Sequence, residues 1–365
     1  MKNTFGTSLA VTVFGESHGS SIGAVLDGIA PGIKIDLDYI NEKLSLRRPV
    51  GKISTPRHEE DPVIFESGVF NGYTTGTPLC IRIPNADTRS KDYSATRFLA
   101  RPSHADFTAY EKYHGFEDFR GGGHFSGRIT AALVASGAIV MHALEENGIF
   151  IGTHIKRCAN INDTGFSQDI LSDIKALSKK AFATLSDESG LLMQQKIIQA
   201  RESLDSVGGV LETAVVGLPS GVGEPWFDTL ESLISHAVFS IPAVKGIEFG
   251  AGFALSDMRG SEANDPFRMN NGKTVTSSNN SGGINGGISN GMPIIFRTAV
   301  RPTPTVGIEQ NTVDISKSEN ATLTSHGRHD PCIVHRARIV QDCVTALVIY
   351  DAMATRFGTD WAVKK

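Results

Sequence analysis

The chain is poor in the residues that mark several classes of protein. Its 365 residues include only four cysteines. None of them forms a C-x-x-C pair, which argues against a zinc knuckle or a thioredoxin-type motif. So few cysteines in so long a chain fit a reducing compartment better than a disulfide framework. The four are Cys80, Cys158, Cys332 and Cys343.

Long apolar runs and an excess of basic charge are also missing. No stretch approaches 18 uninterrupted apolar residues, so we expect no membrane span. The formal net charge of -4 argues against a general nucleic-acid binder. The apolar stretch at 9–14 is followed at once by Glu16 and His18, which a signal peptide would not allow. The composition, 40% hydrophobic and 20% charged, predicts a cytoplasmic enzyme with a packed core.

Short strand patterns and a few long helical patterns alternate irregularly, which favours an α+β fold over a doubly wound parallel sheet. No linker divides the chain, so we expect one domain over residues 1–365. The Asn-, Ser- and Gly-rich segment 269–292 is expected to be a long loop that closes over a ligand. Strands are expected at 9–14, 22–26, 78–83, 214–218 and 294–300, and helices at 38–46, 128–147, 191–204 and 339–357.

Three histidines lie in short clusters of glycine, arginine and small polar residues. They are His18 in Gly-Glu-Ser-His-Gly, His104 in Arg-Pro-Ser-His-Ala-Asp, and His329 in Arg-His-Asp-Pro-Cys. Imidazole exchanges protons near neutral pH, and guanidinium grips carboxylate and phosphate. The clusters therefore predict a site where an anionic substrate undergoes proton transfer. They can also be combined into a metal site, but no H-E-x-x-H or H-x-x-E-H helix pattern supports a metal, and we expect none.

Residues 15–19 also match G-x-S-x-G, the nucleophile elbow of hydrolases, with Ser17 as nucleophile. An elbow needs several preceding strands, and about one fits before residue 15. A serine hydrolase stays open as an alternative. A non-catalytic flavin- or phosphoanion-binding protein is the other.

Two further segments suit an anion. The glycine triplet at 121–123 leads through Ser126 to Arg128 at the start of a predicted helix, and helix N-termini bind anions. Arg301 to Thr305 places two hydroxyls and a guanidinium in a rigid proline frame, which can hold a phosphate with little ordering cost.

Taken in order, these motifs resemble the chorismate synthase family over nearly the whole chain. The matching segments are 15–19, 27–28, 47–49, 89–93, 101–106, 121–128, 243–246, 282–287, 301–305 and 328–332. The resemblance implies a β-α-β sandwich, with a central helical layer between antiparallel sheets, and a homotetramer. It implies that 5-enolpyruvylshikimate-3-phosphate loses phosphate and a C6 proton to give chorismate by 1,4-anti elimination, the last step of the shikimate pathway. Reduced FMN is required without net redox change.

The resemblance also assigns residues. His18 is similar to the acid-base group that assists phosphate departure, His104 to the one that keeps the flavin protonation correct, and Asp330 to the aspartate near flavin N5. Arg47, Arg101 and Arg128 resemble substrate anion binders. The flavin-lining positions correspond to His124, Phe125, Ser126, Pro242, Ala243, Gly286, Arg301, Pro302, Thr303, Pro304, Thr305 and Arg328.

Some positions depart from the family pattern. His124 and Phe125 stand where many members have Arg-Ser, which leaves side-chain contacts to FMN open, whereas backbone contacts would survive. Arg301 replaces a common Lys, Lys52 stands near a usual Arg, and Asp342 replaces a frequent Glu. Whether the chain reduces its own flavin with NADPH, as bifunctional members do, also stays open.

Overall fold

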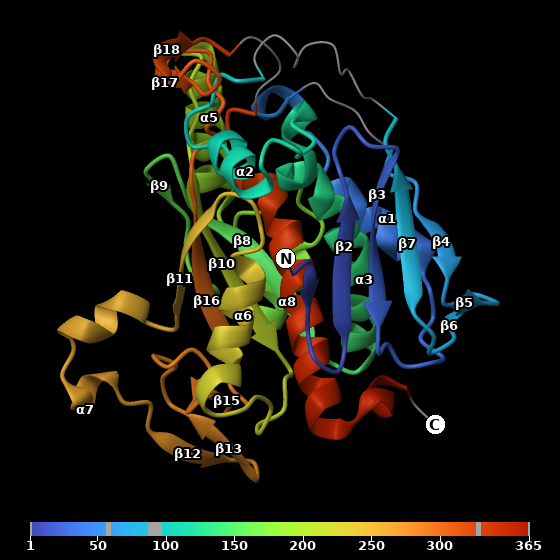
Figure 1. Ribbon diagram of the computed structural model, residues 1–365. Helices are drawn as coiled ribbons and strands as arrows, with labels where there is room; N and C mark the ends of the chain where they lie inside the picture. Colours follow the sequence, from blue (N-terminus) through green and yellow to red (C-terminus); the bar gives the residue numbers. More distant parts are fainter. Residues whose placement is uncertain (1, 56–59, 87–96, 326–329, 364–365) are drawn as a thin grey trace.

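The computed structural model describes residues 2–55, 60–86, 97–325 and 330–363. Two five-stranded sheets enclose a layer of long helices (Figure 1). Every strand pairing in both sheets is antiparallel. The expected α+β sandwich with a helical layer between antiparallel sheets is confirmed.

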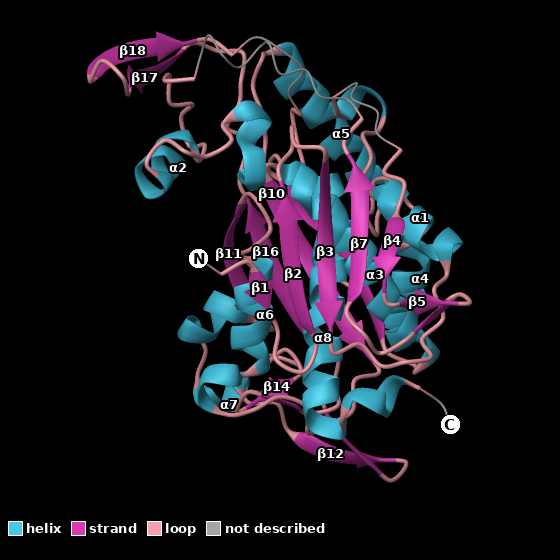
Figure 2. Cartoon of the chain, turned by 45° about the vertical axis from the view of Figure 1, so that its right-hand side comes forward, coloured by secondary structure: helices cyan, strands magenta, loops and turns pink. Residues whose placement is uncertain are grey.

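The first sheet has the strand order β1-β2-β3-β7-β4. Its strands lie side by side in Figure 2, with α3 behind them. Alternate residues of β3 and β7 point into the core, and Ile22, Ile81 and Ile83 are fully buried. The strands are β1 (Thr4–Phe5), β2 (Ala10–Gly15), β3 (Ser21–Asp27), β4 (Ile64–Ser67) and β7 (Leu79–Pro84).

The second sheet has the order β11-β16-β10-β8-β9. On its inner face, Thr153 and Thr213 join hydroxyls at 2.7 Å, and Gln341 of α8 donates to Thr213 at 2.6 Å. These bonds fix the last helix onto the sheet. The strands are β8 (Phe150–Cys158), β9 (Ile161–Asn162), β10 (Gly209–Val216), β11 (Val244–Phe249) and β16 (Ile294–Val300).

The helical layer is built around α3 and α8, which cross closely. A Cβ added at Gly137 of α3 would lie 2.4 Å from the Cβ of Cys343 on α8, so glycine is required for this approach. The core of buried apolar side chains is continuous from the first sheet through both helices. The helices are α1 (Leu37–Leu46), α2 (Asp106–Tyr113), α3 (Thr130–Glu146), α4 (Ile170–Leu177), α5 (Asp187–Glu202), α6 (Leu230–Val238), α7 (Gly260–Ala263) and α8 (Val334–Phe357).

Helix α3 and the turn before it, Gly127–Glu146, are long and apolar enough to cross a membrane by length and composition. They do not form the uninterrupted run of 18 apolar residues sought in the sequence, because polar residues interrupt them at Arg128, Thr130, Ser136 and His142. In the fold, 83% of the most apolar 18-residue window is buried. The apolar composition is accounted for by the core position of the helix.

The strands and helices expected from periodicity are confirmed, with boundaries that move by a few residues; α8 begins at Val334 rather than 339. The long loop expected at 269–292 is wrong. Residues Lys273–Thr276 form β13, which pairs with β12 (Phe267–Asn270). The turn between them has Asn271 at φ 47° and Gly272 at φ 76°, as a tight two-residue hairpin requires. A second hairpin joins β14 (Ile284–Asn285) to β15 (Ile288–Ser289).

Both of these hairpins lie at the lower end of the molecule in Figure 1, beyond the start of β16. Two further two-stranded sheets lie outside the two main sheets. They are β5 (Val69–Phe70) with β6 (Tyr73–Thr74), and β17 (Gln310–Asp314) with β18 (Glu319–Leu323).

Candidate active site

One end of the sandwich, the upper end in Figure 1, collects the termini of elements from the whole chain. Strands β2, β7 and β16 and helix α1 end there, and helices α3 and α8 begin there. The helix N-termini bring free N–H groups and a positive dipole end. Most of the site residues expected from the sequence sit on these ends.

His18 lies in the turn that connects β2 to β3 and is 6% exposed. The Ser17 hydroxyl lies 3.1 Å from His18 Nδ1 and also 3.1 Å from the carbonyl oxygen of Gly121. The Ser17 amide donates to the Gly123 carbonyl at 3.1 Å. The glycine triplet therefore forms the wall against which the imidazole rests.

The same geometry excludes a nucleophile elbow at Ser17. An elbow is a strand–turn–helix with its serine exposed at the top. Here the turn leads into a second antiparallel strand, β3, and Ser17 is 5% exposed with its hydroxyl near two backbone carbonyls. The serine hydrolase alternative loses its structural basis.

Arg47 and Arg128 come together from the end of α1 and the turn before α3, and each is 7% exposed. Arg47 donates from Nε to the Thr130 hydroxyl at 3.0 Å and from Nη2 to the Gly127 carbonyl at 3.3 Å. Both arginines also bind one carboxylate, that of Asp61. Asp61 is not among the residues expected from the sequence, because the segment Glu-Glu-Asp-Pro that contains it matches none of the motifs considered there.

His104 and Arg101 lie just before α2. His104 Nε2 is 2.8 Å from the Thr305 hydroxyl, which connects it to the expected flavin segment. Arg101 forms a two-bond pair with Asp106, from Nε at 2.8 Å and Nη2 at 2.7 Å. Burial acts to raise the pKa of Asp106, but the hydrogen bonds and charge of Arg101 outweigh it and hold that pKa below its usual range.

Asp330 lies before α8 and is held on both oxygens. Oδ1 accepts from the Thr55 amide at 2.9 Å and Oδ2 from Arg336 Nη1 at 2.6 Å. Arg336 also donates from Nε to the carbonyl of Arg47 at 2.7 Å. Asp330 is thus tied to the arginine pair. The expected flavin residue Arg328, and His329, fall outside the described residues.

The expected flavin residues at 124–126 have partners of their own. His124 Nδ1 donates to the Gly15 carbonyl at 2.8 Å, which clamps the end of β2. Ser126 caps the turn before α3 by accepting from the Arg128 amide at 3.3 Å. Phe125 is 44% exposed, and its ring packs edge-on against that of Tyr113 of α2, with 6.1 Å between the ring centroids. This contact connects the His18 side of the site to the His104 side.

The second expected flavin segment follows β16. The Arg301 amide donates to the Ala243 carbonyl at 3.0 Å, next to Pro242, and Arg301 Nη2 donates to the Ser103 carbonyl at 2.7 Å. Gly286 is not brought to this group. It lies in the β14–β15 turn, at the other end of β16.

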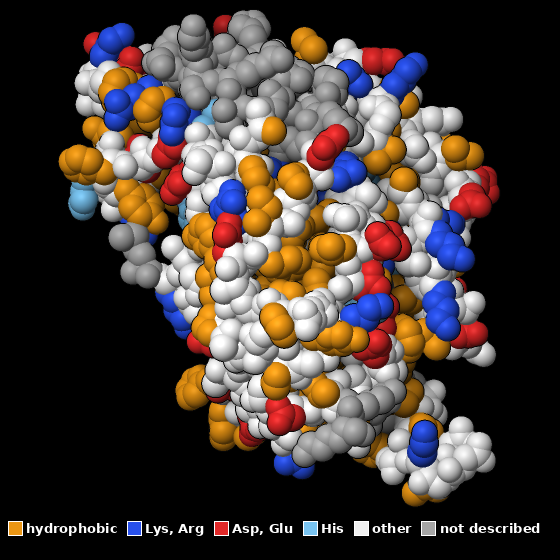
Figure 3. Space-filling view, turned by 90° about the vertical axis from the view of Figure 1, so that its right-hand side faces the viewer, with side chains coloured by type: hydrophobic (Ala, Val, Ile, Leu, Met, Phe, Trp, Pro, Cys, Tyr) orange, Lys and Arg blue, Asp and Glu red, His pale blue; other side chains and the backbone are white. Residues whose placement is uncertain are grey.

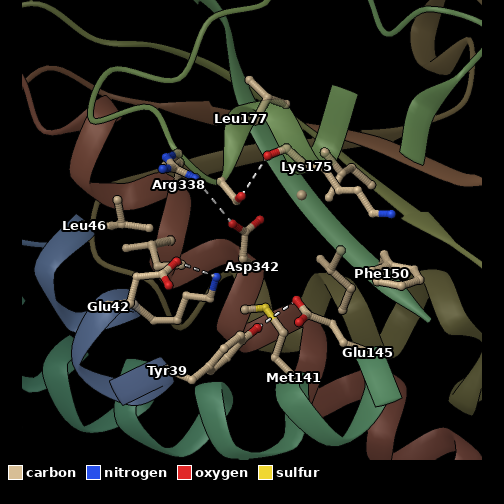
Figure 4. Close-up of a pocket in the computed structure, with 16 residues that line it drawn as sticks. Tyr39, Glu42, Leu46, Met141, Glu145, Phe150, Lys175, Leu177, Arg338 and Asp342 are labelled. Carbon is tan, nitrogen blue, oxygen red and sulfur yellow. Dashed lines mark hydrogen bonds and ion pairs between the residues drawn. The ribbon is translucent and has the colours of Figure 1, made fainter. Parts of the chain in front are cut away.

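A second concave region lies on the side of the sandwich, away from all of these residues. It is a cavity of about 260 Å³ between α1, α3, α4, α8 and β8. Asp342 points into it, with Arg338 Nη1 at 3.8 Å, and Tyr39 donates to Glu145 at 2.7 Å (Figure 4). Burial raises the pKa of Asp342 to about 6, because the long ion pair with Arg338 offsets it only partly. Among the residues that the structure describes, no site residue expected from the sequence lines this cavity.

Comparisons with known proteins agree with the residue pattern. A sequence model described as chorismate synthase matches residues 9–354. The chain is 44% identical over 360 residues to the chorismate synthase of Dehalococcoides mccartyi, covering 98% of each chain. It is 46% identical over 351 residues to that of Chitinophaga pinensis, covering 96% of each. A chorismate synthase crystal structure superposes with a TM-score of 0.77 at 28% identity, over 97% of this chain and 94% of the other.

The fold and the sequence are those of a carbon-oxygen lyase of the shikimate pathway. The chain belongs to the chorismate synthase family.

Proposed function

We propose that this chain converts 5-enolpyruvylshikimate-3-phosphate into chorismate and phosphate by 1,4-anti elimination with reduced FMN, and that residues 1–365 act as one domain. The observation that carries the proposal is that hydrogen bonds and ion pairs connect the His18 turn, Arg47, Arg128 and Asp330 at one end of the sandwich. His104 joins the same end through α2 and the 301–305 segment.

The substrate carries two carboxylates and a phosphate, and the proposed anion binders are Arg47, Arg101 and Arg128. Arg47 and Arg128 are buried, so their charges are weakly screened, and Arg128 stands at the N-terminal end of α3. Arg101 shares its guanidinium with Asp106, which holds it in a fixed orientation.

For the flavin we propose the segments 124–126, 242–243 and 301–305, together with Gly286 and Arg328. Two buried polar atoms of this set, Arg301 Nε and the Thr303 hydroxyl, have no hydrogen-bond partner among the described residues. Unsatisfied buried polar atoms are costly unless a bound group satisfies them, so they fit a polar cofactor edge. When bound, reduced FMN supplies electron density to the C–O bond that breaks.

The proton-handling groups are proposed to be His18, His104 and Asp330. His18 is held against the glycine wall, where its ring can donate a proton to the departing phosphate. The bond between His104 Nε2 and Thr305 keeps that imidazole beside the flavin segment. Asp330, fixed by Thr55 and Arg336, presents a carboxylate whose position does not depend on solvent.

One assay tests this proposal. Phosphate release and chorismate absorbance are followed anaerobically with the substrate and chemically reduced FMN. We expect chorismate only with reduced FMN, and the flavin still reduced at the end. Product with oxidised FMN and no reductant would contradict the mechanism, and flavin binding without turnover would favour a non-catalytic homologue. Adding NADPH with oxidised FMN shows separately whether the chain reduces its own flavin.

We also propose a homotetramer in the cytoplasm. Large apolar side chains are exposed around α6 and α7: Trp226 is 85%, Phe227 92% and Phe253 82% exposed. Figure 3 shows further hydrophobic side chains gathered on another face, bordered by acidic and basic ones. Apolar patches of this kind mark interfaces.

Gly286 lies at the other end of β16 from Arg301, so its proposed flavin contact would be to the flavin of another subunit. Sedimentation analysis of the purified protein tests the assembly.

A further inference from the structure

Two like charges are buried side by side at the proposed substrate end of the site. The side chains of Arg47 and Arg128 are 8% and 5% exposed. They lie 81 residues apart in the sequence, since Arg47 follows α1 and Arg128 precedes α3. Two guanidinium groups cannot be held together away from water unless a counter-charge offsets their repulsion and loss of hydration.

Asp61 provides that counter-charge. Its side chain is fully buried, and each oxygen serves one arginine: Oδ2 lies 3.3 Å from Arg47 Nη1, and Oδ1 contacts Arg128 Nη1. Asp61 has φ 51°, in the left-handed region that aspartate adopts more readily than most residues. The three side chains together carry one net positive charge.

The arginine pair is also tied to the His18 turn. Arg128 donates from Nε to Asn85 Oδ1 at 3.0 Å. The other end of the same amide, Asn85 Nδ2, donates to the carbonyls of Glu16 and Gly19 at 2.9 Å each. A displacement of Arg128 would therefore be transmitted through Asn85 to the backbone on both sides of His18.

We propose that Asp61 is a positioning residue. Its buried carboxylate fixes the guanidinium groups of Arg47 and Arg128 as one preformed anion-binding cradle, at a set position relative to His18. The inference rests on the proposed role of Arg47 and Arg128 in binding a substrate anion. A preformed cradle holds the substrate at reacting distance without reorganisation, and small misplacements of such groups cost large factors in rate. Asp61 thus acts on turnover through the arginines, without touching substrate.

The test compares Asp61→Asn, which removes the charge, with Asp61→Glu, which keeps it but moves the carboxylate by one methylene. A matched control is Asp351→Asn. Asp351 is equally buried, but it accepts from the amides of Ser8 and Leu9 at 2.7 and 2.8 Å, far from the arginines. With reduced FMN, we expect both Asp61 variants to lose kcat by about tenfold or more. The control should lower Tm and retain kcat within about twofold, since no reacting group moves.

Two kinetic outcomes would overturn the proposal. If either Asp61 variant keeps both the kcat and the KM of the wild type, Asp61 is only structural. If KM falls while kcat is retained, Asp61 is a stand-in for the substrate carboxylate that the substrate must displace.

Thermal unfolding keeps the inference separate from the proposed function. Asp61→Asn should lower Tm strongly in the wild-type background and much less in an Arg47→Gln background, where one of the two buried charges is gone. Equal shifts in both backgrounds would refute the charge coupling even if the wild type makes chorismate. If the wild type makes none, the proposed function fails, and the coupling is still decided by Tm.

Discussion

Gly121 lies directly against the imidazole of His18. A Cβ built on Gly121 would come within 2.1 Å of His18 Cε1 and 2.3 Å of Nδ1, and Gly121 has φ 59°. Both the space and the backbone conformation therefore require glycine at this position. The glycine triplet noted in the sequence is needed to seat this histidine.

Gly121→Ala should displace the His18 ring and lower kcat by about 10²-fold, the scale expected when a proton-transfer group is misplaced. Gly127→Ala is the matched control, because a Cβ there has open space and no left-handed φ is needed. Steady-state kinetics with reduced FMN on both variants give the comparison. Equal activity of the two variants would show that His18 tolerates movement and is not the proton donor.

His104 should depend on its hydroxyl partner. His104→Ala is expected to lose about 10²- to 10⁴-fold in kcat, and Thr305→Val, which removes only the 2.8 Å bond to Nε2, a smaller factor with a shifted pH profile. Thr322→Val, at an exposed position of β18, should change neither. A pH–rate profile for each variant makes the measurement. Near wild-type turnover in His104→Ala would remove the acid-base assignment.

The sequence predicts best what is encoded locally. Strands and helices follow from periodicity, and His18, His104 and Arg128 stand out because glycine or proline surrounds them. The hairpins at 269–292 were missed because Asn271 and Gly272 suit a loop and a two-residue turn equally well, and only strand pairing decides between them.

The buried polar partners could not be predicted in this way. Asp61, Asn85 and Arg336 lie outside the motifs from which site residues are predicted, yet each joins two segments of the site. Their roles come from contacts between residues distant along the chain, which no local pattern encodes.

Arg128→Lys should lower both Tm and the affinity for the substrate. A solvent-exposed anion-binding arginine could be replaced without a change in Tm, whereas Arg128 also bonds to Asp61 and Asn85, and lysine cannot keep both bonds.

Asp342 should make the protein less stable as pH rises. Burial raises the pKa of Asp342 from 3.8 to about 6 in the folded state, so the folded protein binds more protons than the unfolded chain between these values. The free energy of unfolding therefore falls as pH rises from about 4 to about 6 and is then level, by about 3 kcal/mol for this group. Asp342→Asn has no carboxyl group at this position to titrate, so it should not lose stability in this way.

Urea unfolding of wild type and Asp342→Asn at pH 4.5 and pH 7.5 tests the point. We expect the variant to gain stability relative to the wild type at the higher pH. A difference between the two proteins that is the same at both pH values would mean that Asp342 is ionised throughout, with Arg338 offsetting its burial in full.

His335 should make the protein less stable as pH falls, which is the opposite pH dependence to that of Asp342. Its Nε2 lies 2.7 Å from the Ser54 hydroxyl and its ring stacks on Phe182, in a site that is 1% exposed. Burial, and then the charges of Arg336 and Arg338, lower the pKa of His335 from 6.5 to about 3. The unfolded chain therefore takes up a proton below about pH 6.5 that the folded protein does not bind until about pH 3.

Stability is thus lost as pH falls through 6.5, and at pH 5 the loss amounts to about 2 kcal/mol from this imidazole. His335→Gln can keep a hydrogen bond to Ser54 but does not titrate, so its free energy of unfolding should change less between pH 7.5 and pH 5 by that amount. His114→Asn, at an exposed imidazole, should keep the pH dependence of the wild type. Urea titrations at the two pH values give the free energies of unfolding. If His335→Gln and the wild type lose the same stability between pH 7.5 and pH 5, His335 is already protonated in the folded protein. Its burial would then not account for the loss of stability in acid.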